Sequence, residues 1–309
     1  MFSWPIVFTV VSGFCFSALG LCYKTASARA CRATPFAVVF SAVAAGISLV
    51  ATGWQPTNWL DSRLWVMGVG VGICWYLAIL AIIYANLWGP ATISWVVVNL
   101  SLLVPIGMAP LLFHEPLYLV DFGVLALFIL MLLAFARGMA EGGESQQIRV
   151  LPFVLVLTGL FFINGLALIM SKVKQDVFHE SNSAAYMAIF YGTCAIIGTL
   201  VHLLGARKRT AFTREEWRVG ALAGLCSSFG VLLLLLAMSL PTVVVYPVSQ
   251  GLALIGGVFL TKFIYREHFT LYKWLGVAFG LAVLLTAVCR EPLAHLLDAH
   301  LLSMLHSGK

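Results

Sequence analysis

Apolar stretches long enough to cross a membrane alternate with short polar connectors along almost the whole chain. A helix needs roughly 20 apolar residues to span about 30 Å of hydrocarbon. The stretches that meet this length are Pro5–Tyr23, Pro35–Gly53, Leu64–Asn86, Gly89–Phe113, Leu117–Ala136, Val150–Ser171, Ala184–Gly205, Trp217–Ser239, Thr242–Ile264 and Thr270–Cys289. We therefore expect an all-α polytopic membrane protein with ten transmembrane helices.

The sequence also repeats itself. Shifted by 152 residues, Trp65–Glu115 aligns without a gap with Trp217–Glu267. The polar segment 138–149 separates five spans from five more, and an odd number of crossings makes the second half enter the membrane from the opposite side. This pattern predicts two inverted five-helix repeats, 1–137 and 150–290, joined by that segment. Leucines at helical spacing in the tail, 291–309, predict an amphipathic helix lying in the membrane interface.

Two features recur at the same places in both halves. Each third span has a glycine pair four residues apart, and small residues at that spacing let a second helix approach closely in lipid. The pairs are Gly68 with Gly72 and Gly220 with Gly224. The connectors 87–90 and 239–242 are short and lead into the next span, so we expect tight antiparallel hairpins at both places.

Composition excludes a soluble domain, because 61% of the residues are hydrophobic, 10% are charged and the mean hydropathy is +1.01. The net charge of +6 is an orientation signal rather than a sign of a nucleic-acid partner. Most Lys and Arg follow odd-numbered spans, and by the positive-inside rule these connectors are cytoplasmic and both termini outside. They are Lys24, Arg29, Arg32, Arg137, Arg149, Arg207, Lys208, Arg209, Arg214, Arg218, Lys262, Arg266 and Lys273, against Arg63, Lys172, Lys174, Arg290 and Lys309.

Two segments, together with Lys24 and Lys172, carry a family resemblance. They are WVVVNLSLLVPIGMAPLLFHEPLYLVDFGVLALFILMLLAFARG, residues 95–138, and YPVSQGLALIGGVFLTKFIYREHFTLYKWLGVAFGLAVLLTAVCR, residues 246–290. The chain resembles the drug/metabolite transporter (DMT) superfamily in its EamA-type, ten-helix branch. Two departures stand out: the second span lacks the Arg that the family often has there, and family members usually place both termini in the cytoplasm, against the charge count.

Polar and aromatic side chains inside the spans are the candidates for substrate binding. Trp95 and Asn99 share one helix face, as do Tyr246 and Gln250. When the two halves are aligned by the 152-residue shift, the Tyr246 and Gln250 face is offset from the Trp95 and Asn99 face by about one residue, or roughly 100° around the helix. The predicted site is therefore chemically asymmetric. Further candidates, for which packing or interhelical hydrogen bonds are the alternative, are Trp75, Tyr84, Asn164 and Tyr191.

Other chemistries lack the residues they need. The seven cysteines form no CxxC pair, and His295, His300 and His306 do not share a helix face, so we expect neither a metal nor a cofactor. No nucleotide-binding GxxxxGK[ST] motif is present. No Asp or Glu lies mid-span, which disfavours both drug–proton exchange through a buried carboxylate and an intramembrane catalytic set. Glu115 and Glu267 are expected to cap the start of the next helix or to pair with a neighbouring base such as Arg266, and Lys24 and Lys172 to act as interfacial anchors.

Together these observations predict a multi-pass protein of a cell (inner) membrane. The expected function is secondary transport, as an exporter of a small neutral or zwitterionic metabolite such as an amino acid, by alternating access. A flippase or exporter of a lipid or lipid-linked head group is the alternative, and an intramembrane enzyme is a weaker one. The expected partners are the substrate and the bilayer, without nucleic acid, and a homodimer stays open.

Overall fold

A computed structural model describes residues 4–53, 61–88, 91–140, 150–177, 182–205, 211–265, 270–290 and 292–293. This described part folds into α-helices and contains no strand. The helices are α1 (Trp4–Ala28), α2 (Ala33–Ala51), α3 (Ser62–Trp88), α4 (Ala91–Leu100), α5 (Leu103–Leu112), α6 (Leu119–Ala140), α7 (Val150–Val177), α8 (Ser183–Gly205), α9 (Arg214–Ala237), α10 (Thr242–Tyr265) and α11 (Leu271–Val288).

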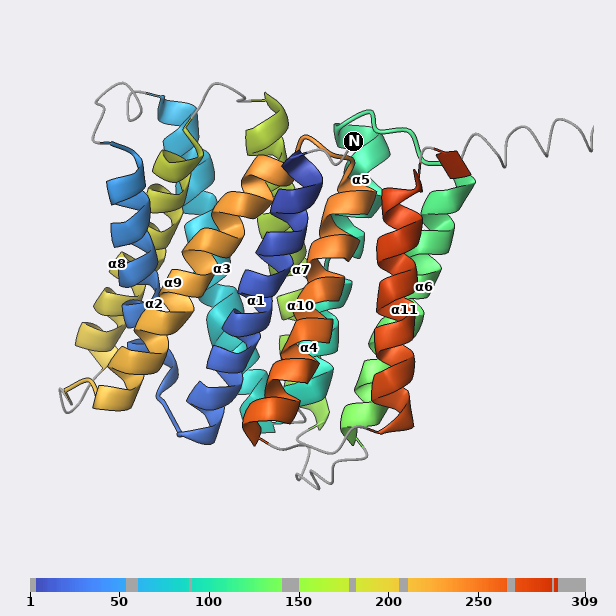
Figure 1. Cartoon of the computed structure of the whole chain (residues 1–309). Coiled ribbons are helices and arrows are strands. Elements are labelled where there is room, and N and C mark those ends of the chain that lie inside the picture. The colour runs from blue at the N-terminus through green and yellow to red at the C-terminus, as the bar shows by residue number, and fades with distance from the viewer. Residues whose placement is uncertain are drawn as a thin grey trace, which may run out of the picture.

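The helices run up and down through one bundle, and α1 begins on the same side of it as α11 ends (Figure 1). Within the described residues, nine helices are long and apolar enough to cross a membrane. The broken pair α4–α5 occupies the place of the remaining predicted span. The prediction of a multi-pass membrane protein is thereby confirmed, while most of the tail and residues 141–149 of the linker lie outside the described residues.

The prediction of one continuous helix over Gly89–Phe113 was wrong. The helix is interrupted at Ser101 and Leu102, where Pro105 has no N–H to donate to the Ser101 carbonyl. The carbonyl of Ser101 instead accepts from the amide of Val104 at 3.1 Å, and the amide of Leu102 donates to the Asn99 carbonyl at 3.4 Å. The corresponding helix of the second half, α10, continues unbroken through its own proline.

The paired glycines lie where helices approach most closely. A Cβ built on Gly68 would meet the Ile189 side chain of α8 at 2.6 Å, and one on Gly72 would meet the Phe190 carbonyl oxygen at 2.5 Å. Gly220 and Gly224 pack in the same way against α2. The expected role of these four positions as helix contacts is therefore confirmed.

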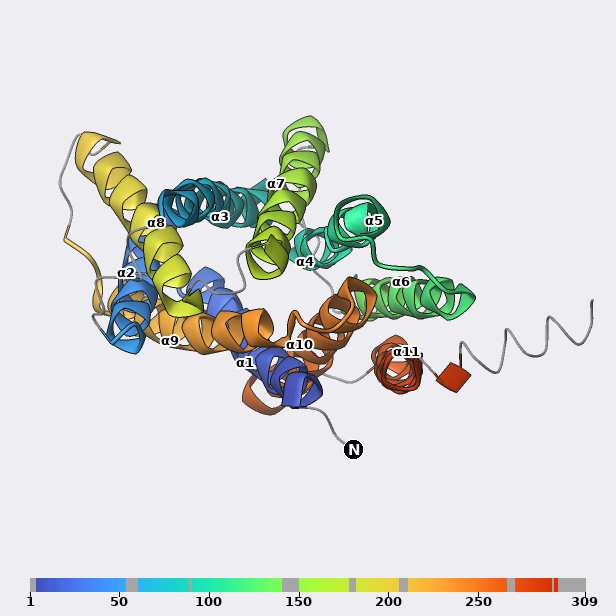
Figure 2. The same cartoon turned by 90° about the horizontal axis from the view of Figure 1, so that it is seen from above.

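The helices pack in two groups: α1–α3 against α7–α10, and α6 against α11. The helix α1 lies against α9 and α10, α2 lies against α8 and α9, and α3 lies against α7 and α8. The helices α6 and α11 pair with each other at one end of the bundle, as the view from above shows (Figure 2). Most buried side chains form one large cluster, and a smaller cluster lies among α3 and α7.

Substitution of Gly224 by Ala is expected to destabilise the bundle by about 1–3 kcal/mol, because the new Cβ would collide with the backbone oxygen of Phe40. Gly46→Ala is the matched control, since nothing lies within 4 Å of a Cβ at that position of α2. Thermal unfolding of both variants in the same detergent measures the difference. Equal melting temperatures would contradict a close contact at Gly224.

Candidate functional site

Aromatic side chains from several helices meet in the core of the bundle. Tyr191 of α8 is fully buried, and its hydroxyl lies 2.6 Å from that of Ser227 on α9. The ring of Trp75, near the middle of α3, lies 5.9 Å from that of Phe190 and 6.4 Å from that of Tyr191. The indole N–H of Trp75 is buried and has no hydrogen-bond acceptor in the described part of the chain. Two predicted site residues, Trp75 and Tyr191, are thus neighbours.

Two more buried tyrosines connect this cluster to α7. The hydroxyl of Tyr246 on α10 donates to the Leu168 carbonyl at 3.0 Å. The hydroxyl of Tyr186 lies 3.2 Å from that of Ser171, and the Tyr186 ring lies 5.6 Å from the ring of Phe190. Aromatic rings and hydroxyls therefore form a continuous polar and aromatic path from α10 through α7 and α8 to α3.

The break between α4 and α5 is the second part of the site. Because the Leu102 amide bonds to Asn99, the carbonyl of Val98 lacks its usual i+4 donor. The side chains of Ser101 and Asn164 replace that donor: Ser101 Oγ donates to it at 2.6 Å and Asn164 Nδ2 at 3.3 Å. Asn164 also donates to Ser101 Oγ at 2.6 Å.

Two predicted site residues, Asn99 of α4 and Asn164 of α7, lie near this break, and Asn164 bonds to it directly. Asn99 lies in the last turn of α4 and is buried. A Cβ on Gly165 would lie 2.7 Å from Val104, so α7 packs directly against the start of α5. The sequence signal for this arrangement was Pro105 in the centre of an apolar span.

The remaining predicted residues are Gln250, Tyr84 and Trp95. Gln250 is half-buried on α10, one turn after Tyr246. Tyr84 is 45% exposed and stacks on Trp88 at the end of α3. Trp95 belongs to α4, but its side chain lies outside the described residues.

An ion cluster lies at the ends of α7 and α9 and the start of α10, which form part of the upper end of the bundle in Figure 1. Lys172 Nζ lies 3.1 Å from Glu115 Oε1 and 3.2 Å from Asp176 Oδ1, and it donates to the Met238 carbonyl at 2.8 Å. Glu115 also accepts from the amide and the hydroxyl of Thr242, at 2.7 and 3.0 Å. Lys172 is therefore not an interfacial anchor, and Glu115 caps α10 rather than the helix that follows it.

A second ion pair at the same end joins α6 to the end of α11. Arg290 binds both carboxylate oxygens of Asp121, with Nε at 2.7 Å and a terminal nitrogen at 2.9 Å. The same carboxylate accepts from the backbone amide of Tyr118 at 2.8 Å. The hydrogen bonds to Asp121 raise the pKa of Arg290 above its ordinary value. This pair fastens two helices that also pack along their length.

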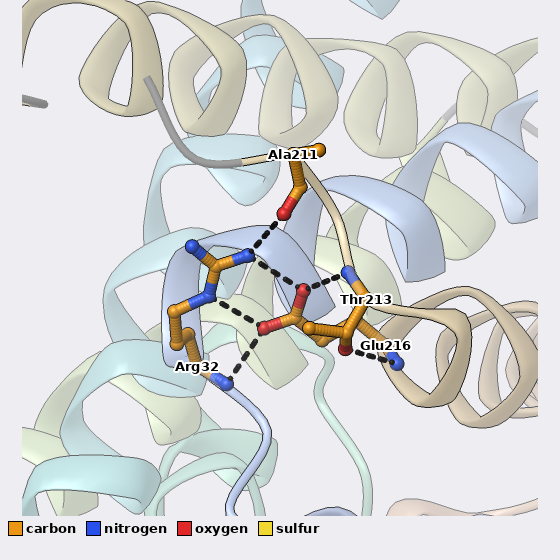
Figure 3. Close-up of polar contacts among 4 residues, drawn as sticks. All are labelled: Arg32, Ala211, Thr213 and Glu216. Atoms are coloured by element: carbon orange, nitrogen blue, oxygen red, sulfur yellow. Dashed lines mark hydrogen bonds and ion pairs between the residues drawn. The ribbon is translucent and has the colours of Figure 1, made fainter. Parts of the chain in front are cut away.

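The opposite end carries a comparable joint between α2 and α9 (Figure 3). The carboxylate of Glu216 accepts from Arg32 Nε at 2.7 Å, from its terminal nitrogen at 2.8 Å and from its backbone amide at 3.1 Å. Glu216 also forms a capping box with Thr213 at the start of α9. These bonds raise the pKa of Arg32 above its ordinary value.

Comparison with known proteins supports the fold. No family model matches the chain, and no curated protein does. Among matching solved structures, one crystal structure has a TM-score of 0.77 and covers 96% of this chain and 100% of its own, at 15% sequence identity. Since the identity is low, this likeness establishes the fold alone and says nothing about a substrate.

Asn164→Ala is expected to destabilise the protein by about 1–3 kcal/mol, because it removes the donor to the Ser101 hydroxyl and one donor to the half-buried Val98 carbonyl. Thr158→Ala on the same helix is the control, since its exposed hydroxyl bonds only within α7 and should change stability by less than about 0.5 kcal/mol. Thermal unfolding measures both. A neutral Asn164→Ala would show that the break does not need this amide.

Glu216→Ala should cost at least about 1–2 kcal/mol, because it removes the carboxylate half of the capping box of α9 together with the Arg32 pair. Glu215→Ala, one residue earlier, removes a more exposed pair with Arg29 and should cost less than about 1 kcal/mol. Chemical or thermal unfolding of the two variants compares them. Similar losses would mean that the Glu216 pair stabilises no more than a surface contact.

Proposed function

We propose that this protein is a secondary transporter that moves a small neutral or zwitterionic metabolite, such as an amino acid, by alternating access. The observation that carries the proposal is the break between α4 and α5, halfway along a membrane span. Irregular backbone at membrane depth is tolerated where it is buried in protein or lines a cavity, and in transporters such breaks mark the substrate site. Asn99 and Asn164 lie at this break.

The symmetry of the packing supports two inverted repeats of the EamA type. The helix α8, the second helix of the other half, packs against the glycine pair of α3. In the same way, α2 packs against the glycine pair of α9. The helices α3 and α9 run in opposite directions (Figure 1). A two-fold axis in the membrane plane would relate the two contacts, as inverted repeats require.

The chemistry of the core favours a substrate without net charge. Amides, hydroxyls and aromatic rings occupy the middle of the bundle, whereas the buried ion pairs of the described residues lie at its two ends. An ionised substrate held mid-membrane would need an opposite charge there. The indole N–H of Trp75 and the amide of Asn99 can instead bind uncharged oxygen or a carboxylate whose charge an adjacent ammonium balances.

Uptake into proteoliposomes tests the proposal, after a thermal-shift screen of amino acids and related compounds has provided a substrate. Trp75→Phe removes the N–H and replaces the indole by a smaller aromatic ring, and Asn99→Ala removes the amide. Each should lower uptake about tenfold, the effect of losing one hydrogen bond worth about 1.4 kcal/mol.

Tyr84→Phe is the matched control, because Tyr84 is exposed near the end of α3, and its uptake should equal that of the unmodified protein. If neither Trp75→Phe nor Asn99→Ala changed uptake, the proposed binding site would be wrong. Stabilisation by lipid-linked head groups alone, with no soluble substrate, would point instead to a flippase. Assignment to the cell (inner) membrane is part of the same proposal.

A further inference from the structure

The ion cluster at the upper end of the bundle is complete without any ligand. An ammonium has three N–H donors, and those of Lys172 have three acceptors, on Glu115, Asp176 and the Met238 backbone. Both oxygens of the Glu115 carboxylate are also used, since the hydroxyl and the amide of Thr242 donate to them. Because each of these groups is satisfied, the cluster is a joint rather than a vacant binding site.

Glu115 is the one member of this joint that comes from the first half of the chain. Lys172 and Asp176 lie on α7, while Met238 and Thr242 flank the turn between α9 and α10. The carboxylate of Glu115 therefore ties the connector between α5 and α6 to the second half. At the start of α10 it also meets the positive end of the helix dipole.

Glu115 differs from the carboxylates of the other two buried ion pairs. Glu216 and Asp121 lie in the first turns of α9 and α6, and each bidentate arginine pair fastens helices that pack along their length. Glu115 lies on an irregular connector, 113–118, and its cation is a flexible lysine. Breaking its bonds would move the connector without separating a packed helix pair.

The connector begins with a helix-terminating turn. His114, directly before Glu115, has a φ of +54°, the left-handed conformation that often follows the C-terminus of a helix. The backbone amides of Phe113 and Glu115 donate to the Ala109 carbonyl at 2.9 and 3.4 Å. The backbone of this turn is therefore held from α5 itself, and the Glu115 side chain is what bonds to the second half.

We propose that Glu115 is the releasable member of a latch that holds this face of the transporter closed. This inference rests on the proposed alternating-access function and adds the device that selects between its states. When the carboxylate leaves Lys172 and the start of α10, the connector 113–118 separates from the second half and this face opens. Because the two repeats move as a pair, opening of this face closes the opposite one.

Hydrogen–deuterium exchange of the purified protein in lipid nanodiscs tests the latch. Glu115→Gln should speed exchange several-fold in residues 166–176 and 238–246, near the latch. It should also slow exchange in residues 20–28 and 258–265, at the opposite ends of α1 and α10. Thr242→Val, which removes one of the bonds to Glu115, should shift both faces in the same directions by a smaller factor.

Asp176→Asn is the matched control. This substitution also removes a carboxylate that pairs with Lys172, but both residues lie on α7, so no bond between the two halves is lost. The opposite face should therefore exchange as in the unmodified protein. A monodisperse elution profile and a measured melting temperature establish that each variant is folded.

Faster exchange confined to 113–118 and 238–246 in Glu115→Gln would show that Glu115 is a static helix cap and would overturn the latch. Solute uptake by the unmodified protein would still stand in that case. The opposite result is also informative. If Glu115→Gln speeds exchange at one face and slows it at the other, but no solute is taken up, the latch would be supported and the proposed transport function would be wrong.

Discussion

In hydrocarbon, every backbone N–H and C=O must find its partner within the protein, and this constraint organises the whole structure. It explains why the described part is helical, because a helix satisfies its backbone groups within one segment. It also explains the form of the only interrupted span, α4–α5, among the described helices. The carbonyl of Val98, which loses its amide donor at the break, receives the side chains of Ser101 and Asn164 instead. A break in a membrane span thus depends on a polar residue from another helix.

The same constraint places charge at the two ends of the bundle. Arg32 with Glu216, Arg290 with Asp121 and Lys172 with Glu115 are ion pairs near helix termini, and each has at least one buried member. Backbone amides add further hydrogen bonds to the carboxylates. The two arginine pairs are bidentate and lie between helices that also pack along their length. The lysine pair involves an irregular connector instead. Pairs of similar charge therefore differ in what must move to break them: two packed helices for each arginine pair, and the connector 113–118 for the lysine pair.

Several elements followed from the sequence with little ambiguity. The nine long spans were predictable because membrane thickness sets a length that a local apolar run either reaches or does not. The glycine pairs were predictable as close helix contacts because no other residue lets two backbones approach so closely. The interruption of α4–α5 had a visible signal, Pro105 in mid-span, but the prediction of a continuous helix ignored it. A similar proline in α10, Pro247, does not break that helix, so proline alone does not decide the outcome.

The sequence by itself determined the class of the protein, the spans, the paired glycines and the set of polar residues available inside the membrane. These properties depend on local composition and spacing, on which the bilayer acts directly. The tertiary structure alone decided which side chains meet. It joined Trp75 to Tyr191, placed Asn164 at the break, separated Tyr84 from the other candidates and paired Lys172 with Glu115. Such pairings depend on how each helix is rotated and on which neighbour it packs against. Many small contacts along the whole bundle fix that geometry together.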